Sequence, residues 1–128
     1  SADRETEIDI TAQTGIKSLD VTIDCDNLDA RELGTMGIPA RFDLCNIEGF
    51  EDTNGTMHPA EDVREAISAL GFPIEDAVKD KPSIRLKIDK MFTRLLTGFP
   101  GNNNFILTVT ENNGLSTTKT LKYYVPAN

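Results

Sequence analysis

Residues 105–125 read FILTVTENNGLSTTKTLKYYV, and this stretch decides the fold of the chain. Residues 105, 107 and 109 are apolar and alternate with Ile106 and two threonines, and residues 121, 123 and 125 are apolar and alternate with Lys122 and Tyr124. This is the period of a half-buried β-strand. Residues 111–115, between the two runs, carry the turn-forming triplet Asn-Asn-Gly. The stretch therefore predicts one antiparallel β-hairpin.

The length of the turn decides which side chains of this hairpin share a face. A two-residue loop at Asn113-Gly114 would place Leu121 opposite Ile106, and the apolar faces of the two strands would then be mismatched. A three-residue loop, closed by Gly114 in the left-handed region, restores the match. We predict this loop, and its cross-strand pairs are Glu111 with Leu115, Leu107 with Lys119 and Phe105 with Leu121.

Three further stretches alternate in the same way, and each predicts a strand with one face in water. They are residues 7–11, 19–24 and 84–89. Thr14-Gly15 is a turn signal between the first two. Residues 42–45 are a candidate sixth strand.

Three short helical signals lie between the strands. The first covers residues 30–33, with N-cap candidates at residues 26–29 and a stop at Gly34 or Gly37. The second starts at Pro59 and ends before Gly71, and its apolar stripe is Val63, Ile67 and Leu70. The third follows Asp89 and ends at Gly98, with an apolar stripe of Met91, Phe92, Leu95 and Leu96.

Strands near both ends and helices in the central connections predict the fold class. We expect a mainly β chain with short helical inserts, arranged as an Ig-like antiparallel β-sandwich of about six to seven strands. Residues 46–58 and 98–103 are polar and rich in turn formers, so we expect surface loops there. Residues 1–128 should form a single Ig-like domain.

The composition excludes two classes of partner. Thirteen basic and twenty-one acidic residues give a net charge of -8. This charge repels phosphate backbones and anionic lipids, so we expect neither nucleic acid nor the membrane itself as a partner of this domain. A glycan or another surface protein remains open as a partner.

No motif assigns a catalytic residue or a cofactor. His58 is the single histidine, and no G-x-S-x-G elbow accompanies it. Asp24, Asp26 and Asp29 are the calcium candidates, although their spacing does not match an EF-hand, and helix capping is the alternative role. Cys25 and Cys45 could form one disulfide or remain two small buried thiols.

The strand pattern itself produces one binding candidate. If Leu121, Tyr123 and Val125 point inward, Tyr124 points outward beside Lys122, where an aromatic ring can stack on a sugar or anchor a protein. Phe50 and Phe99, in the expected loops, are further ligand-binding candidates. We expect any ligand-binding surface to include some of these four residues, which are Tyr124, Lys122, Phe50 and Phe99.

Several stretches resemble the Ig-like domains of uncharacterised surface lipoproteins of gut Bacteroidetes. These stretches are Met91-Phe92 to Leu96, residues 104–114, residues 118–121, residues 15–17 leading into 19–21, and Leu70-Gly71-Phe72-Pro73 ahead of residues 76–79. The resemblance implies export to the cell surface or periplasm, a larger lipid-anchored parent protein of which residues 1–128 are a fragment, and a role beside polysaccharide capture. It carries no catalytic motif.

Two functional hypotheses follow. In the first, the chain is a non-catalytic Ig-like module of a cell-surface or periplasmic protein, acting as a spacer or as a protein- or glycan-binding domain. The alternative is a small carboxylate-dependent hydrolase, with or without a metal. Paired acids lining a deep pocket would favour the alternative.

Overall fold

The computed structural model describes residues 6–88 and 95–127 of the chain. These residues form mainly β-strands, with short helices in the central connections. The elements follow one another in the order β1 (Thr6–Thr11), β2 (Ile16–Cys25), α1 (Ala30–Thr35), β3 (Arg41–Asp43), β4 (Phe50–Glu51), β5 (Met57–His58), α2 (Ala60–Ala69), the 3-10 helix η1 (Glu75–Ala77), β6 (Ser83–Ile88), β7 (Gly101–Glu111) and β8 (Ser116–Val125).

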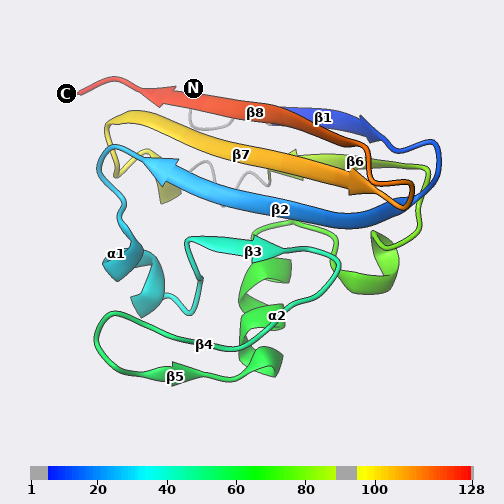
Figure 1. Cartoon of the computed structure of the whole chain (residues 1–128). Helices are drawn as coiled ribbons and strands as arrows, with labels where there is room; N and C mark the ends of the chain where they lie inside the picture. The colour runs from blue at the N-terminus through cyan, green and yellow to red at the C-terminus, as the bar shows by residue number, and fades with distance from the viewer. Residues whose placement is uncertain (1–5, 89–94, 128) are drawn as a thin grey trace.

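The strands form one large and two small antiparallel sheets. The large sheet has four strands in the order β3-β2-β7-β8, while β1 pairs with β6 and β4 pairs with β5. Figure 1 shows β1 and β6 behind the large sheet, and α1, α2 and the β4–β5 hairpin below it. The helices therefore lie in the central connections, as the sequence predicts.

The large sheet and the β1–β6 sheet share one hydrophobic core. Val21 of β2 and Phe105 of β7 are fully buried, and Ile10 of β1 and Leu86 of β6 belong to the same cluster. Two antiparallel sheets that enclose one core form a β-sandwich-like arrangement. The predicted mainly β fold class is confirmed.

The C-terminal hairpin has the predicted register. Phe105 pairs with Leu121 and Leu107 pairs with Lys119, and the Glu111 N–H donates to the Leu115 carbonyl over 2.8 Å. Gly114 has φ 92°, so the loop closes through a left-handed glycine. The three-residue loop is confirmed.

The predicted turn at Thr14-Gly15 is present, but the strands on its two sides belong to different sheets. Gly15 has φ 95°, and its carbonyl accepts a hydrogen bond from the Asn112 N–H over 2.9 Å. The Asn112 side chain donates to the Thr14 carbonyl, also over 2.9 Å. A Cβ on Gly15 would lie 2.7 Å from Asn112 Nδ2, so only glycine leaves room for this contact between the turn and the hairpin loop.

The first two helices follow the sequence signals. Asp29 caps α1, because its carboxylate accepts a hydrogen bond from the Glu32 N–H over 2.9 Å. Helix α2 starts after Pro59 and buries Val63 and Ile67 against the core. Gly71, with φ 98°, follows its end and stops the helix as predicted.

Residues 89–94 lie outside the described part of the chain, and with them most of the predicted third helix. Its last turn is described at Leu95 and Leu96. Leu96 is fully buried, but Leu95 is 40% exposed. Of these two positions in the predicted apolar stripe, Leu96 is therefore core and Leu95 is surface.

The predictions of two surface loops are partly wrong. Residues 46–58 contain the β4–β5 hairpin and the buried Ile47. The sequence did not predict this hairpin, because strands of two residues are too short to produce a visible alternation. Residues 98–103 end as a loop at Pro100, since β7 already begins at Gly101. Asn103 is buried in that strand, where its amide donates to the carbonyls of Phe99 and Gly101.

We predict that Gly114→Ala destabilises the chain by about 1 kcal/mol, because an L residue in the left-handed region is strained. A Cβ at this position would meet no atom within 4 Å, so the loss would come from the backbone alone. Denaturant unfolding measures the change. The control is Gly98→Ala, where the added Cβ makes an ordinary 3.5 Å contact; an equal loss in both variants would contradict the predicted turn strain.

Candidate functional site

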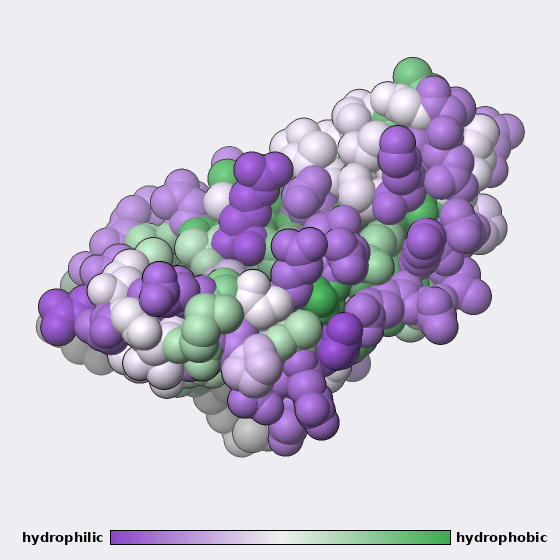
Figure 2. All heavy atoms as spheres, turned by 60° about the horizontal axis from the view of Figure 1, so that its bottom comes forward, coloured by the Kyte–Doolittle hydropathy of each residue, from purple (hydrophilic) through white to green (hydrophobic). Residues whose placement is uncertain are grey.

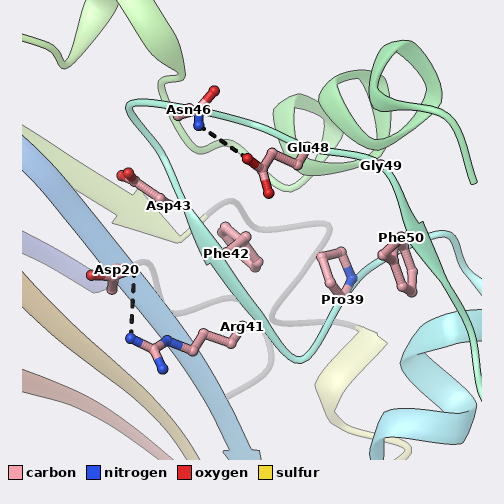
Figure 3. A pocket seen from close by; sticks show the side chains of 9 residues that line it. All are labelled: Asp20, Pro39, Arg41, Phe42, Asp43, Asn46, Glu48, Gly49 and Phe50. Carbon is pink, nitrogen blue, oxygen red and sulfur yellow. Dashed lines mark hydrogen bonds and ion pairs between the residues drawn. The ribbon is translucent and has the colours of Figure 1, made fainter.

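A hollow of about 430 Å³ lies between the β2–β3 edge of the large sheet and the segment that leads into β4. Figure 3 shows its two walls. The polar groups of the lining are Asp20, Arg41, Asp43, Asn46 and Glu48, and the apolar ones are Pro39, Phe42 and Phe50. In Figure 3, Asp20 and Asp43 lie on the opposite side of the hollow from Pro39 and Phe50.

Strand alternation in β3 positions the polar wall of the hollow, which consists of Asp20, Arg41 and Asp43. Phe42 pairs with Val21 and is 7% exposed, so it faces the core. Its neighbours Arg41 and Asp43 therefore face outward, on the same side of the sheet as Asp20. Arg41 forms a loose ion pair with Asp20, with 3.9 Å between Nη2 and Oδ1.

Asp43 also holds the edge of the sheet together. Its Oδ1 accepts hydrogen bonds from the backbone N–H of Leu19, over 3.0 Å, and from that of Cys45, over 2.9 Å. On the segment that leads into β4, the Asn46 amide donates to Glu48 Oε1 over 3.3 Å. The polar groups of the hollow are thus fixed partly by the backbone and partly by contacts among their own side chains.

Aromatic contacts fix the apolar wall. Phe42 packs edge-to-face on Phe72, with 6.1 Å between the ring centroids. Phe50 stacks on the His58 imidazole, with 4.9 Å between centroids and 18° between the ring planes. The β4–β5 pairing of Phe50 with His58 brings these two rings together.

The histidine that holds Phe50 is itself bonded to a carboxylate. His58 Nε2 lies 2.8 Å from Asp52 Oδ2, and the two side chains are 18% and 4% exposed. The hydrogen bond from His58, followed by that from the Thr56 N–H, lowers the pKa of Asp52 below its usual range. Gly34 makes room for Asp52, because a Cβ there would lie 2.8 Å from the Asp52 Cβ. The pair therefore joins the two sides of the β4–β5 hairpin, and Asp52 lies against Gly34 of α1.

Sequence analysis did not find the Asp52–His58 pair. The only signal for it is a carboxylate and an imidazole on the two sides of the turn around Asn54-Gly55. No long alternating strand in this segment indicates that the two residues face each other. Asp52 Oδ1 accepts hydrogen bonds from the backbone N–H groups of Asn54 and Thr56. A Ser or Cys side chain bonded to His58, which nucleophilic catalysis would use, is not found among residues 6–88 and 95–127.

The four predicted ligand-binding residues do not form one surface. Phe50 lines the hollow beside β3, whereas Tyr124 and Lys122 lie on β8, the opposite edge strand of the large sheet. Tyr124 is 65% exposed, as its register predicts. Phe99 is partly buried and packs against the core cluster. Of the four, Phe50 alone lies in the hollow.

The three calcium candidates have separate surroundings. Asp26 accepts hydrogen bonds from the Asn102 N–H and side-chain amide, and Asp29 caps α1. Asp24 is exposed on β2. In the described ranges, no group of three or more His, Cys, Asp or Glu side chains is placed to hold a metal ion.

Cys25 and Cys45 are free thiols. Cys45 lies beside Leu19, since Asp43 bonds to both backbones, and Cys25 lies six residues farther along β2. At about 3.3 Å per residue this separates them by roughly 20 Å, well beyond the reach of a disulfide. Burial, chiefly, raises the pKa of each thiol to about 11.

The surface below the large sheet is mostly polar. Figure 2 shows hydrophilic side chains over most of this face, with small hydrophobic areas between them. Within the described chain, no helix combines the length and the apolar character that crossing a bilayer requires.

Comparison of the chain with protein-family models, with curated proteins and with solved structures finds no match.

We predict that Asp52→Ala lowers the free energy of unfolding at neutral pH, and that this loss becomes smaller in acid. A carboxylate whose folded pKa is lowered stabilises the fold above its unfolded pKa of about 4. This contribution is lost as the pH falls through the lower, folded value. Urea unfolding between pH 7 and pH 2.5 measures the effect.

The control for this variant is Asp24→Ala, which removes the same charge from an exposed position. We expect it to change the free energy of unfolding little at any pH. A constant difference between Asp52→Ala and the unchanged chain over the whole range would contradict the pairing of Asp52 with His58.

We predict that both thiols react slowly with a disulfide reagent such as DTNB at pH 7.5, because a pKa of about 11 leaves almost no thiolate. In guanidinium chloride both should react at once and give two thiols per chain. A mass that rises by about 2 Da on reduction would instead reveal a disulfide.

Proposed function

We propose that the chain is a non-catalytic β-sandwich module that binds a glycan in the hollow beside β3. The observation that carries this proposal is that the charged side chains of β2 and β3 lie across one hollow from Pro39 and Phe50. Following the resemblance described above, we place the module in an exported protein of the cell surface or periplasm.

The chemistry of the two walls suits a sugar ring. Carboxylate and guanidinium groups form directional hydrogen bonds with hydroxyl groups, and Asp20, Glu48 and Arg41 supply them here. Aromatic rings provide flat apolar surface for the C–H face of a sugar, and Phe50 is held in place by its stack on His58. The volume of about 430 Å³ lies in the range of small-ligand sites.

The hydrolase alternative has one supporting observation, which is that three carboxylates line the hollow. Glycosidases of the usual type need two carboxyl groups that flank the scissile bond and are available to it. In this chain Asp43 is engaged by two backbone N–H groups and Asp20 is paired with Arg41. These contacts favour binding over hydrolysis.

We predict that Arg41→Ala weakens glycan binding at least about tenfold, because it removes the cationic donor of the polar wall. The probes are hexasaccharides of glucose, xylose, mannose and N-acetylglucosamine, measured by isothermal titration calorimetry. The Arg41 side chain is 72% exposed, so its removal should leave the fold intact.

Arg85→Ala is the matched control, since Arg85 is also an exposed strand arginine paired with an aspartate, Asp9, on the other sheet. It should leave the affinity unchanged. Tyr124→Ala tests the opposite edge of the large sheet. Loss of binding in Tyr124→Ala together with full binding in Arg41→Ala would place the site on β8. Shortened oligosaccharides after incubation with the chain would support the hydrolase alternative.

A further inference from the structure

Two loops of the chain share one turn geometry and one sequence signal. Residues 52–56 connect β4 with β5, and residues 111–115 connect β7 with β8. In each loop the glycine N–H donates to the carbonyl three residues earlier, over 3.0 Å in the first loop and 2.9 Å in the second. Each glycine, Gly55 and Gly114, has a positive φ and follows an exposed asparagine. These are the two Asn-Gly pairs of the sequence.

An Asn-Gly pair can modify itself. The glycine nitrogen attacks the asparagine Cγ, and because glycine has no Cβ, nothing shields this approach. A C–N bond forms, the glycine N–H proton passes to the side-chain nitrogen, and ammonia leaves. Water then opens the resulting succinimide ring at either carbonyl, which yields aspartate or isoaspartate. In isoaspartate the main chain runs through the former side chain and is longer by one carbon.

The structure leaves the first asparagine free for this reaction and restrains the second. Within the described ranges, the Asn54 side chain forms no hydrogen bond, whereas Asn113 Oδ1 accepts one from the Leu115 N–H over 3.0 Å. Strands β4 and β5 have two residues each, whereas β7 and β8 have eleven and ten. Attack requires the glycine N–H to leave its turn hydrogen bond, and a hairpin with such short strands opens more often.

We propose that Asn54 converts spontaneously to isoaspartate and that this conversion releases the Asp52–His58 pair. Asp52 Oδ1 accepts hydrogen bonds from the N–H groups of Asn54 and Thr56, over 2.9 and 3.0 Å. Its Oδ2 lies 2.8 Å from His58 Nε2. An additional main-chain carbon between the two N–H groups moves them apart, so both can no longer hold the carboxylate. The stack of Phe50 on His58 then loses its support.

The first test incubates the folded chain at pH 8 and 37 °C and follows the mass of its proteolytic peptides. Conversion raises the mass of a peptide by about 1 Da. We expect the Asn54 peptide to convert at least about tenfold faster than the Asn113 peptide. In guanidinium chloride the two should convert at similar rates, because neither turn is formed. Equal rates in the folded chain, faster conversion of Asn113, or an equal difference in denaturant would overturn the proposal.

The second test uses His58, the single histidine of the chain, as a reporter of the pair. The converted chain is separated by ion exchange, and Asp-N protease, which cleaves before aspartate but not before isoaspartate, identifies the product at position 54. The isoaspartate form should shift the imidazole NMR signals of His58. Asn54→Asp is the matched control, because it adds the same charge without lengthening the main chain, and it should leave these signals nearly unchanged.

Three outcomes of the second test would contradict the proposal. Aspartate as the sole product at position 54 would show that the main chain is not lengthened. Unchanged His58 signals in the isoaspartate form would show that the pair survives the conversion. Equal shifts in the isoaspartate form and in Asn54→Asp would assign the effect to charge alone. The reaction consumes only water, so none of these results depends on a bound glycan.

Discussion

The register of β7 with its two neighbours is the constraint on which the rest of the structure depends. Phe105 pairs with Ile23 on one side and with Leu121 on the other, so one strand fixes the inward face of both neighbours. A shift by one residue on either side would turn apolar side chains to water. The three-residue loop before β8 satisfies this constraint at one edge of β7. The contacts of Asn112 with Thr14 and Gly15 then tie that loop to the turn before β2.

The same alternation explains the chemistry of the hollow. In β3, the demand that Phe42 face the core sends Arg41 and Asp43 outward, where they meet Asp20 of the neighbouring strand. Charge is placed there as a consequence of the core pattern, and the contacts of Asp43 with two backbone N–H groups make the arrangement tolerable. The Asp52–His58 pair has a similar role in the β4–β5 hairpin, where it replaces the apolar burial that two-residue strands cannot provide.

The sequence predicts the parts of the fold whose signals are local. The hairpin around Gly114 and the helix after Pro59 were readable because alternation, turn residues and helix stops agree within about twenty residues. The sequence does not predict the hollow, since the hollow depends on the β2–β3 pairing that makes Asp20 and Asp43 neighbours. Phe50 is a candidate by its residue type. Its stack on His58 depends on β4 and β5, which are too short to produce an alternating sequence pattern. The sequence does not decide whether Cys25 and Cys45 form a disulfide, because their separation follows from the β2–β3 register.

The central pairing of the large sheet also has a consequence for biogenesis. Strand β2 begins by pairing Ile16 with Glu111, so the first third of the chain waits for the last quarter before its main sheet can form. Contacts of such long range make folding slow, because a large loop must close before they form. During synthesis β2 therefore leaves the ribosome without its partner and stays unpaired until residues 101–111 emerge. The large sheet of a chain with this topology is therefore completed only near the end of synthesis.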